Sequence, residues 1–147
     1  MITFVSALQP KSIQAEGCKK YKENLTKEFE AYKCLYSNLP LEEKLYSKII
    51  YIHKKNITTD VDNISKPFVD AFKGIIYQDD ILIDHRTCSK IKLEDLGLFE
   101  LNLSVLPTEI SERFSQLLES QNEHIVYYEI GIFSEDMVFI GGGKHEA

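Results

Sequence analysis

The chain has 147 residues, of which 44% are hydrophobic and 27% are charged, a balance typical of one globular domain and not of a disordered segment. It has no apolar run long enough to span a membrane, and its first residues lack the features of a signal peptide. Three cysteines, an odd number without zinc-ligand spacing, favour a reducing compartment, so we expect a cytoplasmic protein.

The net charge of −6 is distributed unevenly along the chain. Residues 1–92 hold 15 Lys and Arg against 12 Asp and Glu, whereas residues 93–147 hold 2 against 11. A basic surface attracts phosphate groups, and an acidic surface repels them. The first two thirds of the chain can therefore present positive surface to phosphates, and the last third cannot.

The first part of the chain predicts a strand, a helix and a second strand. Residues 2–8 form a short apolar run, and apolar residues then recur at spacings of three and four over residues 14–36, as on one face of a helix. Residues 45–53 are rich in β-branched and aromatic side chains and predict a central strand. Lys54 and Lys55 follow this strand and are candidate phosphate contacts, with an ordinary polar loop as the competing interpretation.

Two carboxylates one residue apart, Asp60 and Asp62, lead into a short two-faced helix. If both lie in an extended segment, their side chains point to the same side of the chain. Helical spacing places Lys66 and Asp70 on one polar face, opposite a stripe of apolar residues. Pro67 fits only near the start of this helix, where backbone N–H groups lack partners.

A second acidic pair, Asp79 and Asp80, follows the helix. Clusters of carboxylates without nitrogen or sulfur ligands suit a hard divalent cation such as Mg²⁺ or Mn²⁺. Crowded acids would repel each other unless a cation lay among them. Considered as composition alone, a solvated helix cap followed by an Asp-Asp turn explains the same residues.

The last part of the chain predicts two strands, a helix and a hairpin. Residues 81–93 form a strand, and residues 99–106 alternate apolar and polar side chains as its antiparallel partner would. Residues 108–120 carry a helical stripe, two runs at 125–133 and 137–140 indicate a β-hairpin, and a flexible tail begins at about residue 141. The predicted fold is α+β: a single domain with a mixed β-sheet flanked by helices, a β-α-β-α-β-β core, and a C-terminal helix and hairpin extension.

Segment 60–80 has a specific pattern, D-x-D-N-x-x-K, followed by an apolar-Asp-Ala run and by an aromatic residue shortly before Asp-Asp. This pattern resembles the signature of the RusA family of Holliday junction resolvases. The resemblance implies that Asp60, Asp62 and Asp80 are catalytic metal ligands, which requires the three side chains to converge on one cation. It also implies that Lys66 assists catalysis at the scissile phosphate.

The two remaining acids have supporting roles in this interpretation. Asp79 lies behind the metal ligands, and Asp70 orients Lys66 without binding the metal. From its position alone, Lys66 could instead neutralise its helix neighbours Asp62 and Asp70. The resemblance further implies Mg²⁺ or Mn²⁺ as cofactor and a four-way DNA junction as substrate. Because that substrate has two-fold symmetry, a homodimer is expected.

The resemblance covers residues 1–106, which we expect to form the nuclease core. Residues 107–147 are then an acidic extension of the same domain, which could cover an edge strand or bind a protein partner. A calcium loop starting at Asp60 is excluded, because Ser65 and Ala71 stand where it requires Gly and Glu. The functional alternative is a RusA-like module that binds junctions or proteins without cleaving DNA.

Overall fold

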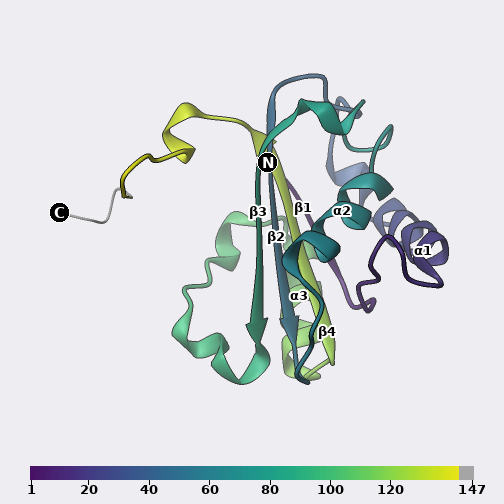
Figure 1. The fold of residues 1–147 in the computed structure, drawn as a ribbon, viewed down its shortest axis with the longest axis vertical. Helices are drawn as coiled ribbons and strands as arrows, with labels where there is room; N and C mark the ends of the chain where they lie inside the picture. Colours follow the sequence, from purple (N-terminus) through teal and green to yellow (C-terminus); the bar gives the residue numbers. More distant parts are fainter. Residues whose placement is uncertain (143–147) are drawn as a thin grey trace.

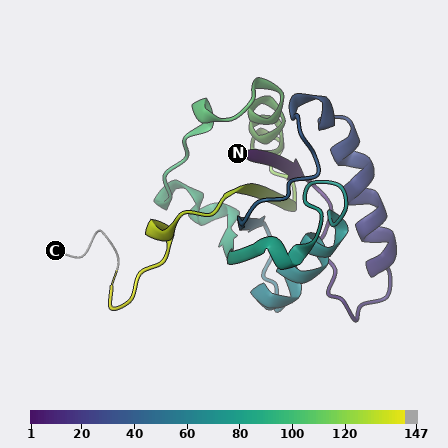
Figure 2. The ribbon, with the colours of Figure 1, turned by 90° about the horizontal axis from the view of Figure 1, so that it is seen from above.

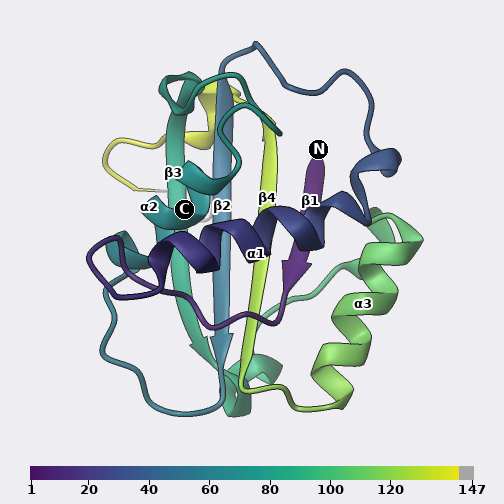
Figure 3. The ribbon, with the colours of Figure 1, turned by 90° about the vertical axis from the view of Figure 1, so that its right-hand side faces the viewer.

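The computed structural model describes residues 1–142, and they form one mixed β-sheet with helices on both faces (Figure 1, Figure 3). The strand order is β1-β4-β2-β3; β4 is antiparallel to both β1 and β2, and β3 is parallel to β2. The predicted α+β class is therefore confirmed. The strands are β1 (Ile2–Ser6), β2 (Leu45–His53), β3 (Ile83–Lys92) and β4 (His124–Ile132), and the helices are α1 (Cys18–Glu30), α2 (Val61–Ala71) and α3 (Thr108–Glu119).

Helices α1 and α2 cover one face of the sheet through a cluster of aromatic side chains. The Phe68 ring of α2 lies 4.5 Å from the Tyr128 ring of β4, measured between centroids, and 5.5 Å from Phe72. Phe4 of β1 contacts Phe72 edge-on at 5.8 Å. Aromatic pairs in such geometries add stability beyond the area that they bury. This cluster therefore determines which side of α2 faces the sheet.

The opposite face is covered by α3 and by the segment of residues 93–106. Ile110, Phe114 and Leu117 of α3 are buried against Val5 and Ile125 of the sheet. These side chains follow the three-and-four spacing of an amphipathic helix. The sheet thus has an apolar layer on each side, and β4, one of its two inner strands, contributes side chains to both layers.

Two predicted strands are absent from the described part of the chain. Residues 99–106 contain a 3₁₀ turn at Leu103–Val105 instead of a strand, and residues 137–140 form no second arm of a hairpin. β4 occupies the position between β1 and β2, and the outer edge of β3, which residues 99–106 were expected to cover, has no partner among the described strands. The predicted flexible tail lies mostly in residues 143–147, outside the described residues.

The helices differ from the prediction at their ends. The region 14–36 is helical over α1, which follows Gly17 in the left-handed region at φ 85°, and a separate 3₁₀ turn at Lys33–Leu35. Pro67 was expected near the start of its helix but is the seventh residue of α2. That expectation is wrong because the helix begins directly after Asp60.

Residues 107–142 are part of the same folded unit as the rest of the described chain, since they supply α3 and the strand β4. Residue 106 as the limit of the nuclease core stays a prediction. Within residues 1–142, the helices are all too short or too polar to cross a membrane.

Phe68→Ala should lower the free energy of unfolding by about 3–5 kcal/mol, because a completely buried ring in the aromatic cluster is replaced by a cavity. Urea denaturation followed by circular dichroism measures this change. Ile81→Ala is the matched control, since Ile81 is 79% exposed and its truncation should cost less than about 0.5 kcal/mol. Equal effects of the two substitutions would contradict the proposed orientation of α2.

Candidate active site

The first acidic pair lies at the N-terminus of α2. Asp60 is the N-cap residue with extended backbone angles, and the Ile64 N–H donates to its carbonyl oxygen at 3.1 Å. Asp62 is the second residue of the helix, so the two aspartates do not share an extended segment, and the alternation of side chains along a strand does not apply to them. Both side chains are exposed, and the positive end of the helix dipole favours carboxylates at this position.

The N-terminus of α2 lies over β3. Lys90 of β3 donates through Nζ to the Thr59 carbonyl oxygen at 2.9 Å. Burial is the main cause that raises the pKa of the Cys88 thiol to about 11, and the carboxylate of Asp62 raises this pKa further. Asp62 therefore acts electrostatically on β3. The first acidic pair and the edge of the sheet thus belong to one surface.

Lys66 and Asp70 form an ion pair one turn apart on the polar face of α2. The Lys66 Nζ lies 3.6 Å from the Asp70 Oδ2, and the two side chains are 54% and 24% exposed. Such an exposed pair stabilises a helix by only about 0.3–0.5 kcal/mol. The ammonium group of Lys66 is thus oriented by Asp70 and still accessible to a ligand.

The second acidic pair begins the turn that leads into β3. Asp79 accepts a hydrogen bond from the Ile81 N–H at 3.1 Å, and Lys73 Nζ lies 3.6 Å from its carboxylate. The hydrogen bond from the Ile81 N–H is the main cause that lowers the pKa of Asp79 below its ordinary value, and the Lys73 ammonium lowers this pKa further. Asp80 in turn lies 4.0 Å from the guanidinium of Arg86. Both acids therefore have cationic neighbours.

The segment between α2 and β3 is anchored by a buried tyrosine. The Tyr77 hydroxyl donates to the Val69 carbonyl of α2 and lies 3.1 Å from the Tyr128 hydroxyl of β4. Burial raises the pKa of Tyr77 well above its ordinary value, so its hydroxyl remains a donor. This anchor determines where the chain leaves the core, just before Asp79 and Asp80.

In the structure, the three predicted metal ligands are not gathered into a metal-binding cluster. Among residues 1–142, no three or more His, Cys, Asp or Glu side chains gather closely enough to hold a metal ion. Asp60 and Asp62 lie at the N-terminal end of α2, whereas Asp79 pairs with Lys73, which follows its C-terminal end. The donor chemistry suits a hard divalent cation. The assignment of Asp60, Asp62 and Asp80 as ligands stays a prediction.

The two lysines after β2 are exposed, but one of them has an acidic partner. The Lys55 Nζ lies 3.2 Å from the Glu123 carboxylate, and the Lys54 N–H donates to the Glu123 carbonyl at 3.1 Å. The His53 ring also contacts the Lys55 carbonyl through Nδ1 at 2.7 Å. The turn that presents these lysines is therefore held by hydrogen bonds, and their role in binding DNA stays a prediction.

Sequence reasoning missed two cationic residues of this surface, Arg86 and Lys90. Positions 86, 88 and 90 alternate along β3, so their side chains share one face of the strand. That face is the one toward α2, as the contacts of Arg86 with Asp80 and of Lys90 with Thr59 show. The alternation was visible in the sequence, but the face that it occupies depends on the packing of α2.

Exposed carboxylates flanked by lysine and arginine are groups that metal-assisted phosphodiester hydrolysis uses. Residues 11–99 match the family model of endodeoxyribonuclease RusA. The chain belongs to this family of Holliday junction-resolving endodeoxyribonucleases, and it is a hydrolase. No curated protein matches the chain at a significant level.

Asp62→Asn should lower the pKa of the Cys88 thiol from about 11, because a carboxylate that disfavours the thiolate is removed. The thiolate is the reactive form, so alkylation should rise at a lower pH. The measurement is the pH dependence of iodoacetamide labelling in a Cys34→Ser background, which removes the exposed thiol. Asp95→Asn is the control. An identical pH profile for Asp62→Asn and the control would place Asp62 away from Cys88.

Proposed function

We propose that this endonuclease nicks four-way DNA junctions as a metal-dependent homodimer, with Asp60, Asp62 and Asp80 as the ligands of Mg²⁺ or Mn²⁺. The observation that supports it best is the polar surface of α2, where the exposed Asp60 caps the helix and the exposed Asp62 precedes Lys66 by one turn. The buried aromatic face of the same helix keeps these side chains outside the core. Nucleases of this family are metal-dependent.

The acidic groups suit such an ion, but they must be brought together to hold it. Asp80 lies 4.0 Å from Arg86, and Asp60 and Asp62 lie at the N-terminal end of α2. A bound divalent ion would supply Lewis acidity and a water of lowered pKa. Exchange of Arg86 from Asp80 to a DNA phosphate would free one carboxylate for the ion and place a cation on the substrate.

Lys66 has the position of a residue that stabilises charge on the scissile phosphate. Its ammonium group is half exposed and is held by Asp70 on the side of α2 that carries Asp62. A preorganised cation acts strongly on the charge that develops in the transition state. In this proposal Asp70 orients the lysine, and Asp79, held by Lys73 and the Ile81 N–H, supports the turn behind Asp80.

The same surface provides the contacts to DNA. Lys54 and Lys55 are exposed in the turn that leads to α2, and we propose that they bind backbone phosphates without reading sequence. The acidic last third of the chain is in this proposal the part that binds a protein partner. All three cysteines are free, which agrees with action in the cytoplasm.

The function is tested by incubating the purified protein with a synthetic four-way junction and with linear duplex of the same sequence, each with and without Mg²⁺. We expect nicks in the junction with Mg²⁺ and intact duplex under both conditions. Binding of the junction without any cleavage in Mg²⁺ or Mn²⁺ would favour the non-cleaving module instead.

Asp62→Asn should lower the rate of nicking by at least about 10²-fold, because a proposed ligand of the ion is removed. Junction binding should remain, because the substitution leaves the fold intact. Cleavage of a labelled junction and a gel-shift assay measure the two properties. Asp95→Asn, which changes an exposed acid outside the proposed site, should cleave at the normal rate. Normal cleavage by Asp62→Asn would remove Asp62 from the site.

Lys66→Ala should slow cleavage by about 10²–10³-fold through the loss of transition-state charge stabilisation. Its melting temperature should stay close to that of the wild type, since only an exposed ion pair is lost. Lys66→Arg should recover part of the rate. A large fall in melting temperature with normal specific activity would show that Lys66 is structural.

A further inference from the structure

A cavity of about 360 Å³ lies at one end of the sheet, where the parallel strands β2 and β3 both finish. Three segments line it: the end of β2 with the turn that follows, the end of β3, and the 3₁₀ helix Leu93–Leu98 with Phe99. We call it the edge cavity. Its volume is typical of pockets that hold small ligands.

The edge cavity adjoins the first acidic pair. Asn56 and Ile57 line it, and they belong to the segment that leads directly to Asp60. Lys90, which also lines the cavity, donates through Nζ to the Thr59 carbonyl at 2.9 Å. A ligand in the edge cavity is therefore held beside the carboxylates that we propose as metal ligands.

One wall of the edge cavity is an exposed aromatic ring. Phe99 is 49% exposed, and its N–H donates to the Leu96 carbonyl at 3.0 Å, where the 3₁₀ helix ends. This hydrogen bond holds the backbone that carries the ring. A nucleobase can stack on such a ring whatever its identity, because every base has a π-face.

Two lysines add positive charge to the cavity. Lys90 and Lys92 are two residues apart on β3, so their side chains point to the same face of the sheet, the face of α2. Lys90 has three ammonium donors and uses one of them on Thr59. Lys92 is exposed and forms no ion pair with the described residues. Both lysines are therefore able to bind phosphate.

The polar side chains of the edge cavity also suit a base. Asn56 is exposed, and its amide can both donate and accept, as contacts with a base edge require. Asp95 lines the cavity too, but its carboxylate repels phosphate, so we assign it no contact with DNA.

We propose that the edge cavity holds one nucleobase that has left its duplex stack, placed on the ring of Phe99, with Lys90 and Lys92 on the phosphates of the same strand. An aromatic face beside free cations is the arrangement by which proteins bind unpaired nucleotides. The proposal rests on the proposed function in one respect, because the junction is the source of this nucleotide.

The edge cavity gives a physical reason for preferring a junction to linear duplex. A base enters the cavity only after it leaves its stack, and this step costs least where pairing or stacking is already interrupted. Strands exchange partners at the branch point of a four-way junction, whereas stacking continues along a duplex. Binding energy from Phe99 is therefore available mainly at the branch point.

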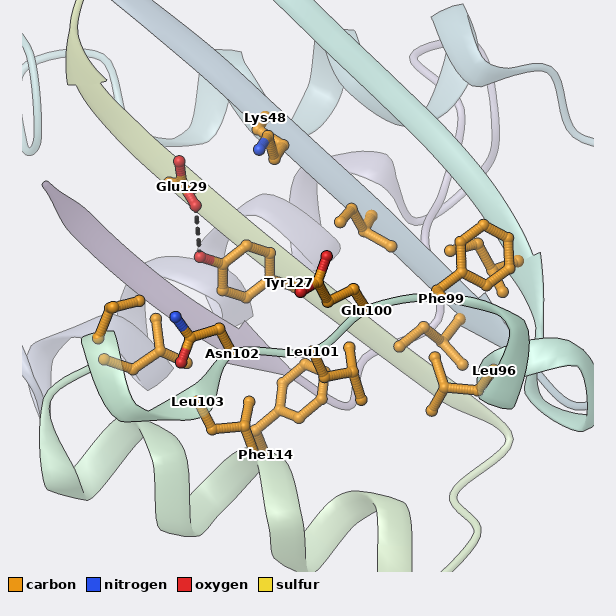
Figure 4. A pocket seen from close by; sticks show the side chains of 15 residues that line it. Lys48, Leu96, Phe99, Glu100, Leu101, Asn102, Leu103, Phe114, Tyr127 and Glu129 are labelled. Atoms are coloured by element: carbon orange, nitrogen blue, oxygen red, sulfur yellow. Dashed lines mark hydrogen bonds between the residues drawn. The ribbon is translucent and has the colours of Figure 1, made fainter. Parts of the chain in front are cut away.

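Leu101 provides a matched control for Phe99. It is 46% exposed and belongs to the same segment, but it lines a different cavity of about 350 Å³, together with Phe114 of α3 (Figure 4). Phe99 borders that cavity as well. Seen from above, α3 lies on the side of the sheet opposite α2 (Figure 2). Truncation of Leu101 therefore removes similar apolar surface away from the edge cavity.

The test compares dissociation constants measured by fluorescence anisotropy without divalent metal, so that no cleavage occurs. The wild type and Phe99→Ala each bind an intact labelled four-way junction and junctions with one abasic nucleotide, placed in turn at each position beside the branch point. At one position the abasic nucleotide should weaken wild-type binding by about 10-fold, and Phe99→Ala should weaken binding of the intact junction equally. The same abasic nucleotide should cost Phe99→Ala nothing further, because the stacking contact is already absent.

Leu101→Ala should bind the intact junction as the wild type does and should show the full loss with the abasic nucleotide. Phe99→Tyr should keep tight binding, since its ring also stacks. A loss in Phe99→Ala as large as that in the wild type would overturn the proposal. So would a wild type that binds intact and abasic junctions equally at every position, whatever the variants do.

A single-stranded oligonucleotide distinguishes this proposal from the proposed function. A protein that binds no junction would contradict the proposed function, yet the edge cavity should still make the wild type bind the single strand more tightly than Phe99→Ala does. Equal affinities of the two proteins for the single strand would overturn the base-binding role of Phe99. A base-dependent affinity without junction cleavage would support that role and count against the proposed function alone.

Discussion

The structure depends above all on the contact between the aromatic face of α2 and the strand β4. Phe68 lies against Tyr128 with a centroid distance of 4.5 Å, and the Tyr128 hydroxyl meets that of Tyr77. This contact buries one side of α2 and thereby forces Asp62 and Lys66 to the surface. It also holds the segment that delivers Asp80. The orientation of the acidic surface is therefore a consequence of hydrophobic packing, which is non-directional but depends closely on shape.

Electrostatic balance at this surface is local. Asp70 has Lys66, Asp79 has Lys73 and Asp80 has Arg86 as neighbours, so each of these three acids lies beside a cation. Each of these pairs is partly exposed, and each contributes little to stability. Because the pairs are weak, a phosphate or a cation can compete for their members. The charged side chains of this surface can therefore leave their ion pairs and bind an anionic substrate.

The acidic last third of the chain is compatible with DNA binding because part of it is structural. It supplies β4, one of the two inner strands, and its Glu129 accepts hydrogen bonds from the hydroxyls of Tyr46 and Tyr127, each at 2.6 Å. These groups lie on the face of the sheet opposite α2. Glu123 similarly pairs with Lys55. The negative net charge therefore does not describe the surface that surrounds α2.

The sequence by itself determined the family, the strand β2 and the helix with its acidic and lysine-bearing face, because these features depend on near neighbours and on motif spacing. Only the tertiary structure decided which segment completes the sheet: residues 99–106 alternate as a strand should, yet β4 takes the central place through contacts with β1 and β2. The pairing of Arg86 with Asp80 was hidden for the same reason. Strand order and cross-strand neighbours arise from long-range packing, which local periodicity does not encode.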